Sequence, residues 1–349
     1  MEKTVVAVLF GGCSTEYEVS LQSAFAVLNH LDARRYAALS VGITRQGEWL
    51  YYHGPLEKIA DGSWCANRLF CSPCTLSLNR GEHKLIVDAD HRMNFSFDVL
   101  FPVLHGKNGE DGTVQGLAEL AGIPLVGCGT LASALCMDKD RAHKLAALAG
   151  IEVPASAAFG RDASFAEIER AALRIGWPLF VKPVRSGSSF GITRVSGPDG
   201  LHQAVNAAFE HDDRILLEQE IKGFEVGCAV MGNETLFTGL VDEIELSGGF
   251  FDYEEKYTLK TSQIHCPARL SEEDTCRVQQ AARTLYRALG CRVFARVDLF
   301  FTPDKRIVFN EINTIPGFTA HSRYPNMMKG AGIEFDALVG NLVELGLER

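Results

Sequence analysis

Residues 294–313 read FARVDLFFTPDKRIVFNEIN, and this stretch decides the fold of the C-terminal part of the chain. Side chains two positions apart in a strand point to the same side of a sheet, so Arg296 lies with Asp298, and Glu311 with Asn313, on one polar face of a predicted hairpin. An arginine, two carboxylates and an amide on a largely buried hairpin are costly unless they bind ligands or one another. Oxygen ligands from the carboxylates and the amide suit Mg²⁺ held together with nucleotide phosphates. The alternative is a structural ion pair between the arginine and a carboxylate.

The first 125 residues alternate strand and helix signals, which predicts a parallel, doubly wound sheet. The expected elements are strands at Val5–Phe10, Ala38–Ile43, Phe97–Leu104 and Gly122–Val126, and a helix at Ser20–Leu31. Residues 54–95 give no regular pattern.

Two α+β domains are expected to follow, over residues 126–225 and 226–349, because antiparallel-looking strands there alternate with helices. A helix broken near Asp138 should open the first of them. The second contains a long segment, 246–264, whose aromatic and charged residues lack periodicity. Long loops of this kind are typical of lids over active sites. The expected fold class is therefore α/β plus α+β.

Composition excludes some classes of function. A net charge of −10 over 349 residues argues against a non-specific nucleic-acid binder, which needs an excess of Lys and Arg. No apolar run approaches the roughly 18 residues that suggest a membrane span, and the N-terminal run Val5–Phe10 is too short for a signal peptide. We therefore expect a cytoplasmic protein whose ten cysteines are mostly thiols.

The segment KPVRSGSSFG (182–191) joins two strand signals and can form a tight loop whose backbone N–H groups converge on phosphate oxygens. Lys182 precedes this loop, and Lys139 stands at the first turn of a helix, where a cation opposes the helix dipole unless it faces an anion. Taken alone, the loop is also compatible with an ordinary hairpin turn, and Lys139 with a solvated side chain.

Three carboxylates are weaker candidates. Glu16 follows a glycine turn at the end of the first strand, where open α/β sheets bind ligands, and could hold a substrate ammonium. Glu218 and Glu225 flank a strand boundary that could contact a nucleotide. For each of them an ordinary surface or strand-end carboxylate explains the pattern equally well.

In this order, the motifs resemble the D-alanine–D-alanine ligase family, whose members have the ATP-grasp fold, over nearly the whole chain. The segments that carry the resemblance are GGCSTEYEVSL (11–21), HGKNGEDGTVQG (105–116), MDKDRAHK (137–144), VKPVRSGSSFGI (181–192), FFDYEEKY (250–257), RVDLFF (296–301) and FNEINTIPGFTAHS (309–322). The resemblance implies an N-terminal substrate-binding domain at 1–125, a two-part ATP-grasp fold at 126–225 and 226–349, and a homodimer.

The resemblance also implies which residues bind ATP and metal. The ATP-binding set would be Lys139, Lys182, Ser186, Gly187, Ser189, Glu218, Glu220, Ile221, Glu225 and Lys256. Two Mg²⁺ ions, for which Mn²⁺ can substitute, would be held by Asp298, Glu311 and Asn313.

The same resemblance implies the catalytic and substrate-binding residues. Glu16 would bind the ammonium of a first D-alanine and, with Ser188 and Tyr257, latch the lid. Arg296 and the N–H of Gly317 would stabilise an oxyanion. The second substrate would meet His105, Asp242, Phe251, Ser322 and Arg323.

The identity of the second substrate depends on two departures from the usual D-alanine–D-alanine pattern. Arg323 stands where those ligases usually have leucine, and Phe251 where they usually have tyrosine. Both changes are similar to the vancomycin-resistance D-alanine–D-serine ligases, especially the VanG type. Arginine offers hydrogen-bond donors to a serine hydroxyl, and Asp242 could orient it. The sequence therefore predicts D-alanine–D-serine ligation, with ordinary D-alanine–D-alanine ligation as the alternative.

Three other functions disagree with features of the sequence. An ATP-grasp ligase for another acid and amine disagrees with the lid and the Glu16 motif. A nucleotide-binding regulator without catalysis disagrees with the intact polar face of the hairpin. A serine hydrolase based on Ser188 lacks the Gly-x-Ser-x-Gly elbow.

Overall fold

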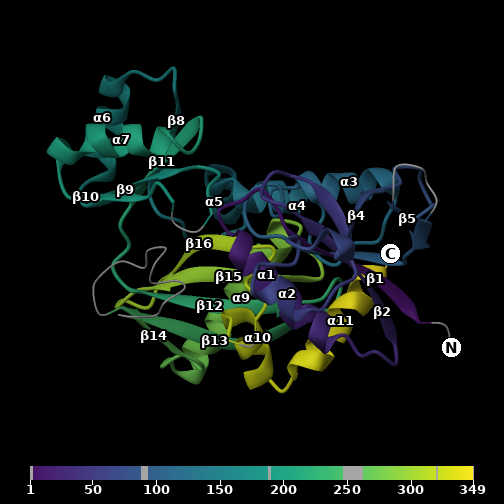
Figure 1. Ribbon diagram of the computed structural model, residues 1–349. Coiled ribbons are helices and arrows are strands. Elements are labelled where there is room, and N and C mark those ends of the chain that lie inside the picture. Colours follow the sequence, from purple (N-terminus) through teal and green to yellow (C-terminus); the bar gives the residue numbers. More distant parts are fainter. Residues whose placement is uncertain (1–2, 88–92, 188–189, 247–261, 320, 349) are drawn as a thin grey trace.

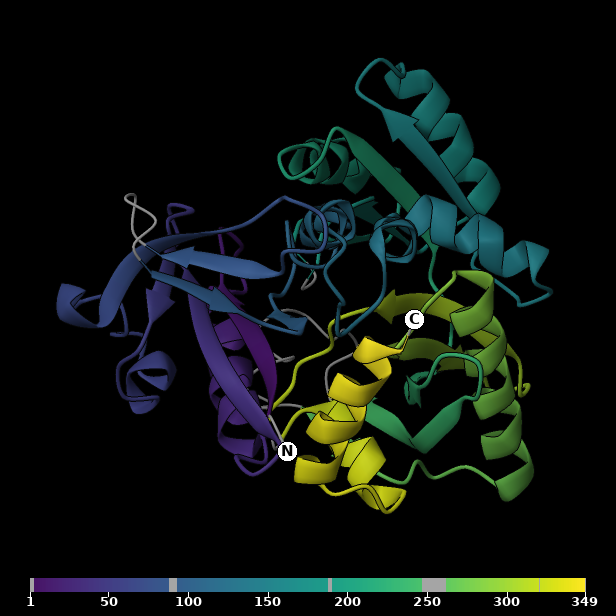
Figure 2. The ribbon, with the colours of Figure 1, turned by 90° about the vertical axis from the view of Figure 1, so that its right-hand side faces the viewer.

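The computed structural model describes residues 3–87, 93–187, 190–246, 262–319 and 321–348. In these residues the strands form three sheets, one in each of three successive parts of the chain. Figures 1 and 2 show residues 156–219 of the central part standing apart from the other two parts, while the N-terminal and C-terminal parts lie side by side.

The N-terminal sheet is mixed. Its order is β6-β5-β4-β3-β2-β1-β7, with β1 parallel to both β2 and β7 and the outer strands antiparallel. Its elements are β1 (Thr4–Gly11), α1 (Tyr17–His30), β2 (Tyr36–Ile43), β3 (Trp49–Tyr52), α2 (Glu57–Ala60), η1 (Arg68–Phe70), β4 (Cys71–Leu76), β5 (Lys84–Val87), β6 (Met93–Ser96), β7 (Val99–Val103) and α3 (Thr113–Ala121).

The predicted parallel arrangement is confirmed where a helix crosses over between strands. Parallel neighbours need a crossover of a dozen residues or more, which α1 supplies between β1 and β2, whereas β3 follows β2 through a short turn and must run antiparallel. The region 54–95, which has no clear sequence pattern, contains these short outer strands. The expected strand at Gly122–Val126 is wrong, because only Leu125 pairs, in an isolated bridge with Leu100.

The central part begins with the broken helix that the sequence predicts. Helix α4 (Thr130–Met137) ends at Asp138, whose side chain then accepts a hydrogen bond from the Arg141 N–H and caps α5 (Lys139–Leu148). The four-stranded sheet that follows has the order β10-β9-β11-β8. Its elements are β8 (Ser156–Gly160), α6 (Phe165–Ile175), β9 (Leu179–Pro183), β10 (Thr193–Val195), η2 (Pro198–Gly200), α7 (Leu201–Phe209) and β11 (Arg214–Gln219).

The C-terminal sheet contains the hairpin predicted at residues 294–313. Its order is β14-β13-β12-β15-β16 and all its pairs are antiparallel. Arg296 faces Asn313 and Asp298 faces Glu311 across the hairpin, which confirms the predicted polar face. The elements are β12 (Phe224–Met231), β13 (Phe237–Leu246), β14 (Ser262–His265), α9 (Glu272–Ala288), β15 (Phe294–Phe301), β16 (Ile307–Asn313), α10 (Arg323–Gly330) and α11 (Phe335–Leu347).

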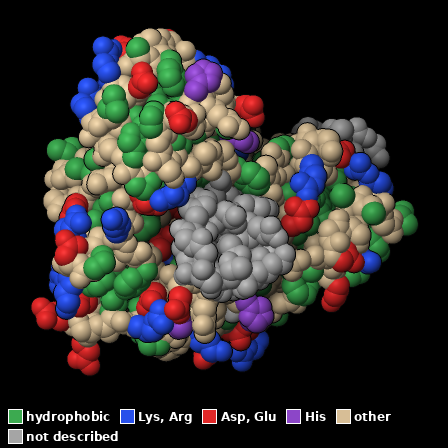
Figure 3. Space-filling model, turned by 90° about the vertical axis from the view of Figure 1, so that its left-hand side faces the viewer, with side chains coloured by type: hydrophobic (Ala, Val, Ile, Leu, Met, Phe, Trp, Pro, Cys, Tyr) green, Lys and Arg blue, Asp and Glu red, His purple; other side chains and the backbone are tan. Residues whose placement is uncertain are grey.

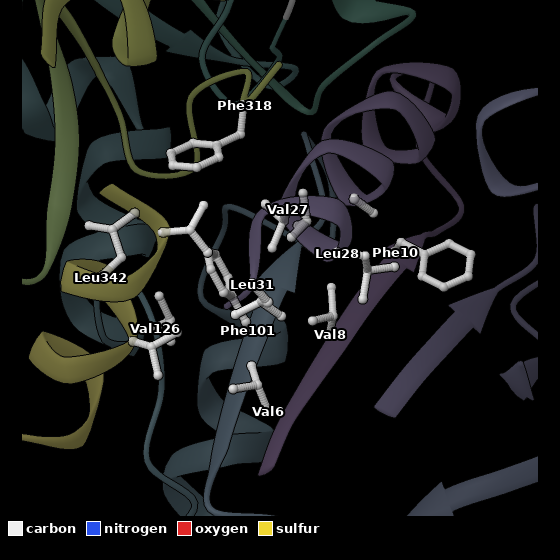
Figure 4. Packing of buried hydrophobic residues seen from close by; sticks show 14 of the residues in the cluster. Val6, Val8, Phe10, Val27, Leu28, Leu31, Phe101, Val126, Phe318 and Leu342 are labelled. Atoms are coloured by element: carbon white, nitrogen blue, oxygen red, sulfur yellow. The ribbon is translucent and has the colours of Figure 1, made fainter. Parts of the chain in front are cut away.

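One apolar core joins the N-terminal and C-terminal parts. Phe318, from the loop after β16, and Leu342, from α11, belong to the same buried cluster as Val27 of α1 and Phe101 of β7 (Figure 4). At the edge of this cluster, the Tyr36 hydroxyl donates a hydrogen bond of 2.8 Å to Glu344 of α11. The shared core fixes the loop after β16 against the ends of β1 and β7.

The surface carries both signs of charge. Figure 3 shows Lys and Arg interspersed with Asp and Glu around the atoms that the structure does not describe. None of the described helices is both long enough and apolar enough to cross a membrane.

Candidate functional site

A cavity of about 500 Å³ lies where the three parts of the chain meet. It collects loops that follow β1, β7, β9 and β16, together with the junction of α4 and α5. Many of the site residues expected from the sequence line it, namely Glu16, His105, Lys139, Ser186, Gly187, Arg296, Glu311, Asn313, Gly317, Ser322 and Arg323.

The carboxylate of Asp298 is the centre of the hairpin's polar face. Arg296 Nε and Nη2 donate to it at 2.8 and 2.7 Å, and Asn313 Nδ2 donates at 2.8 Å. Burial would lower the pKa of Arg296, but the negative charge of Asp298 keeps that pKa above its usual value. The structural ion pair, which the sequence left as an alternative, is therefore present.

The same hairpin also has the donor set of a magnesium site. Asp298 and Glu311 are partners in register, and Asn313 is held by its nitrogen, so that its carbonyl oxygen remains for another contact. Hard oxygen donors of this kind fit Mg²⁺ in the presence of phosphate.

Arg323 contacts three carboxylates. Its Nε and Nη2 donate to the two oxygens of Asp242, both at 2.8 Å, and its Nη1 donates to Glu225 at 2.8 Å and lies 3.4 Å from Asp298. Only 9% of the Arg323 side chain is exposed. Burial opposes the charge, but Asp242 and Asp298 hold the pKa of Arg323 well above its usual value.

The arrangement around Arg323 requires a glycine opposite it on β12. The Gly227 N–H donates to Asp242 at 3.0 Å. A Cβ at this position would lie 2.3 Å from Arg323 Nη2 and 2.6 Å from Asp242 Oδ1. Because Gly227 has no side chain, the Arg323 guanidinium can occupy the space beside it.

The two lysines expected to bind phosphate lie in different settings. Lys139 Nζ donates to the Ser186 carbonyl at 2.8 Å and lies 3.8 Å from Glu311. It therefore links the loop after β9, which contains Ser186 and Gly187 and is called the glycine-rich loop below, to the hairpin. Lys182 Nζ lies 2.6 Å from Glu218 Oε1 in a nearly buried pair. The other oxygen of Glu218 is buried without a hydrogen-bond partner among the described residues and lies 3.7 Å from His143 Nε2.

Glu16 lies at the N-terminal end of α1, where the helix dipole favours a negative charge. Only 9% of its surface is exposed. A Cβ on Gly106 would lie 2.6 Å, and one on Gly187 3.0 Å, from its Oε2. Glycines from the loop after β7 and from the glycine-rich loop therefore both approach this carboxylate closely.

His105 and Glu110 join the loop after β7 to the loop after β16. His105 Nδ1 lies 2.8 Å from the Ile315 carbonyl, and Glu110 accepts hydrogen bonds from the N–H groups of Gly106 and Ile315 at 2.7 and 3.1 Å. Burial lowers the pKa of His105. Burial, and next the charge of Glu16, raise the pKa of Glu110 to about 8.

Some expected residues lie elsewhere. Glu220 pairs with Arg194 in a partly exposed ion pair at 2.6 Å, and Ile221 follows it outside the cavity lining. Predictions for Ser188, Ser189, Phe251, Lys256 and Tyr257 fall outside the described residues.

Three polar residues in or behind the cavity wall are not predicted from the sequence. Glu110 lies within a quoted motif, but nothing in its spacing distinguishes it from its neighbour Asp111. Ser23 lies on the buried face of α1, and His143 lies on α5 with its Nε2 at 3.2 Å from the Asn310 carbonyl. Their roles depend on contacts between distant segments, which no local pattern reveals.

Comparison with known proteins agrees with this geometry. Family models described as the D-ala D-ala ligase N-terminus and C-terminus match residues 5–128 and 145–344. The chain is 45% identical to the vancomycin B-type resistance protein VanB of Enterococcus faecalis, over 100% of both chains. It is 43% identical to a D-alanine–D-alanine ligase of Caldicellulosiruptor bescii, over 100% of this chain and 96% of that one. The crystal structure of the VanG D-Ala:D-Ser ligase from Enterococcus faecalis superposes with a TM-score of 0.93 at 54% identity, covering 99% of this chain and 100% of that one.

The raised pKa of Glu110 predicts a pH-dependent stability. The folded protein holds this proton up to a pH of about 8, whereas the ordinary value is 4.5, so the folded state binds more protons in between. The free energy of unfolding should therefore fall as the pH rises across this window. Glu110→Gln should flatten that fall, as measured by urea unfolding from pH 5 to 8.

Asp111→Asn is the matched control for this experiment. Its carboxylate also accepts two backbone N–H bonds, from Asn108 at 2.8 Å and Thr113 at 3.0 Å, but it is partly exposed. This variant should keep the wild-type slope. An equally steep slope in Glu110→Gln would contradict the assignment.

Proposed function

The chain belongs to the D-alanine–D-alanine ligase family, ATP-dependent ligases that form a peptide bond, and on that premise we propose that it joins D-alanine to D-serine through a D-alanyl phosphate. The observation that carries the choice of D-serine is the buried Arg323, held by two hydrogen bonds to Asp242 at the cavity wall. The VanG D-Ala:D-Ser ligase is among the similar structures.

The first step needs charge neutralisation. A carboxylate is a poor electrophile, so the carboxylate of the first D-alanine attacks the γ-phosphorus of ATP and ADP leaves. Glu16 binds the D-alanine ammonium, and Lys139, beside Glu311 and the Ser186 carbonyl, faces the transferred phosphoryl group. Lys182 and Glu218, with Glu220, Ile221 and Glu225, hold the rest of the nucleotide.

Magnesium would be held by Asp298, Glu311 and Asn313, where it supplies positive charge to the phosphate oxygens. Because Arg296 already pairs with Asp298, this arginine is fixed at the metal side of the cavity. Arg296 can then meet the oxygen that becomes negative in the next step.

In the second step the amine of D-serine attacks the acyl carbon and phosphate leaves. The negative oxygen of the tetrahedral intermediate is stabilised by Arg296 and the Gly317 N–H, each typically worth about 3 kcal/mol. Ser322 binds the carboxylate of D-serine, while Arg323 donates to its hydroxyl. Ser322 and Arg323 adjoin at the start of α10, which favours this joint role.

Rigid placement of Arg323 accounts for selectivity. A site built to hydrogen-bond a hydroxyl rejects an analogue without it, because its buried polar group then lacks a partner. Arg323 Nη2 carries two N–H groups, and among the described residues it donates one hydrogen bond, to Asp242. Its second N–H group can therefore donate to the substrate.

The remaining assignments follow from the family resemblance. We propose that residues 1–125, 126–225 and 226–349 act as three domains with a lid at 246–264. The lid residues Phe251, Lys256 and Tyr257, with Ser188 and Ser189, would close over the acyl phosphate and exclude water. We place the protein in the cytoplasm as a homodimer that makes a peptidoglycan precursor dipeptide of the vancomycin-resistance type.

Ordinary D-alanine–D-alanine ligation is the second candidate, because a relative 43% identical over the whole chain bears that name. The two candidates share every step except the contact made by Arg323.

Competition between the two amino acids tests the proposal. Purified protein is incubated with ATP, Mg²⁺, D-alanine and an equal concentration of D-serine, and the dipeptides are identified by mass. We expect mostly D-Ala–D-Ser, with one ADP released per dipeptide. Mostly D-Ala–D-Ala would overturn the D-serine assignment and support the second candidate, while neither dipeptide nor ADP would contradict ligation itself.

Gly227→Ala tests whether the placement of Arg323 matters. The new methyl group would lie 2.3 Å from Arg323 Nη2, so the guanidinium must move. Overpacking typically costs about 1–3 kcal/mol of stability. We also expect the ratio of D-Ala–D-Ser to D-Ala–D-Ala to fall several-fold in the competition experiment.

Gly42→Ala on β2 controls for overpacking itself, because its Cβ would lie 2.3 Å from the ring of Trp64, far along the chain from Arg323. It should lose comparable stability and keep the wild-type ratio of products. If Gly227→Ala also kept that ratio, Arg323 would not be the selective contact.

A further inference from the structure

The loop after β16 carries Gly317, whose N–H is the proposed oxyanion donor, yet this loop has no regular secondary structure. A backbone donor is effective only if it is held within about 0.5 Å of its productive position. The residues that hold this loop therefore affect catalysis through the position of the Gly317 N–H.

The polar backbone groups on both sides of Gly317 are held by side chains from the N-terminal part. The Ile315 N–H donates to Glu110 at 3.1 Å, and the Ile315 carbonyl accepts from His105 at 2.8 Å. The Phe318 N–H donates to the hydroxyl of Ser23 at 3.1 Å. In the described part of the chain, the Gly317 N–H between them has no hydrogen-bond partner.

The three side chains form one connected unit. A carbonyl only accepts, so His105 donates from Nδ1 to Ile315, and its Nε2, 3.1 Å from Ser23 Oγ, accepts the serine proton. The serine oxygen is then oriented to receive the Phe318 N–H. The lowered pKa of the buried His105 fits the neutral ring that this chain of bonds needs.

Packing adds a second restraint on the same loop. The Phe318 ring is 2% exposed and contacts the rings of Phe101, Phe294 and Tyr324. Phe318 belongs to the same buried cluster as Val27 on α1, the helix that carries Ser23 (Figure 4).

We propose that Ser23 and Glu110, acting with His105, are positioning residues that fix the Gly317 N–H at the oxyanion site. This inference rests on the proposed ligase function. It gives His105 and Glu110, which both line the cavity, a role through the backbone of another part of the chain. We call the hydrogen bonds of Ser23, His105 and Glu110 to the loop after β16 the clamp. Because the clamp crosses from the N-terminal to the C-terminal part, the oxyanion site is complete only when the two parts are docked.

Ser23→Ala tests the clamp against a matched control on the same helix. Ser20 is equally buried, with 0% exposure, and also accepts a backbone N–H, from Gly11 at 2.8 Å, but its bonds stay within the N-terminal part. Both Ser→Ala variants should lose similar stability. Only the Ser23 variant should misplace Gly317.

Two measurements report on the oxyanion site and not on folding. The first is moles of dipeptide per mole of ADP, because a slow second step leaves the acyl phosphate to hydrolyse. The second is inhibition by a phosphinate dipeptide analogue, whose tetrahedral phosphorus mimics the intermediate. Removing one oxyanion donor costs about 10²–10³ in kcat, so its displacement in Ser23→Ala should lower kcat by roughly 10-fold or more.

In Ser23→Ala we expect the dipeptide yield per ADP to fall, the phosphinate Ki to rise by the factor that kcat/KM falls, and the KM for ATP to stay near its wild-type value. Glu110→Ala should behave alike, because it removes the carboxyl group that accepts from both N–H groups, and it serves if Ser23→Ala does not fold. Ser20→Ala should keep the wild-type dipeptide yield per ADP and the wild-type phosphinate Ki. If either of the other two variants folded and also kept both values, the proposed clamp would be overturned. A wild-type protein that makes no dipeptide would instead contradict the proposed function.

Discussion

Asp298 lies 1% exposed between two arginines and an amide, and the site is organised around this one carboxylate. A buried carboxylate is strongly unfavourable without compensating charge, so Arg296 and Arg323 are both required where they stand. Arg323 in turn brings Asp242 and Glu225 into the same network. Strands β12, β13, β15 and β16 and helix α10 are thereby tied at a single point, which the cavity adjoins.

The sequence predicts this centre better than the edges of the fold, for a physical reason. In the hairpin a period of two separates an apolar face from a polar one, and register alone then brings Arg296, Asp298 and Asn313 together. The strands β3, β4, β5 and β6 are only four to six residues long, which is too short for a period of two to stand out in the sequence. At Gly122–Val126 the apolar run is buried without sheet pairing, which hydrophobicity alone cannot distinguish from a strand.

The sequence predicts the charged residues of the site, but it does not predict the residues that act through contacts with the backbone. Lysines, the hairpin carboxylates and Arg323 are conspicuous because their charge is costly inside a protein. Ser23 is one of several small residues on the buried face of α1, and its importance comes from its contacts with His105 and with Phe318, which is 295 positions away. Glu225 is predicted only as a nucleotide-binding residue, but in the structure it accepts a hydrogen bond of 2.8 Å from Arg323. This one carboxylate therefore connects the expected nucleotide site with the second-substrate site.

A double-mutant cycle on Arg323 and Asp242 tests the central claim most directly, namely that a carboxylate-held guanidinium selects the second amino acid. The measured quantity is kcat/KM for D-serine divided by that for D-alanine, in wild type, Arg323→Leu, Asp242→Asn and the double variant. If Asp242 acts through Arg323, wild type favours D-serine, each single change lowers the ratio by roughly 10-fold or more, and the double variant loses no more than Arg323→Leu. A wild-type preference for D-alanine, or losses that multiply in the double variant, would contradict the account.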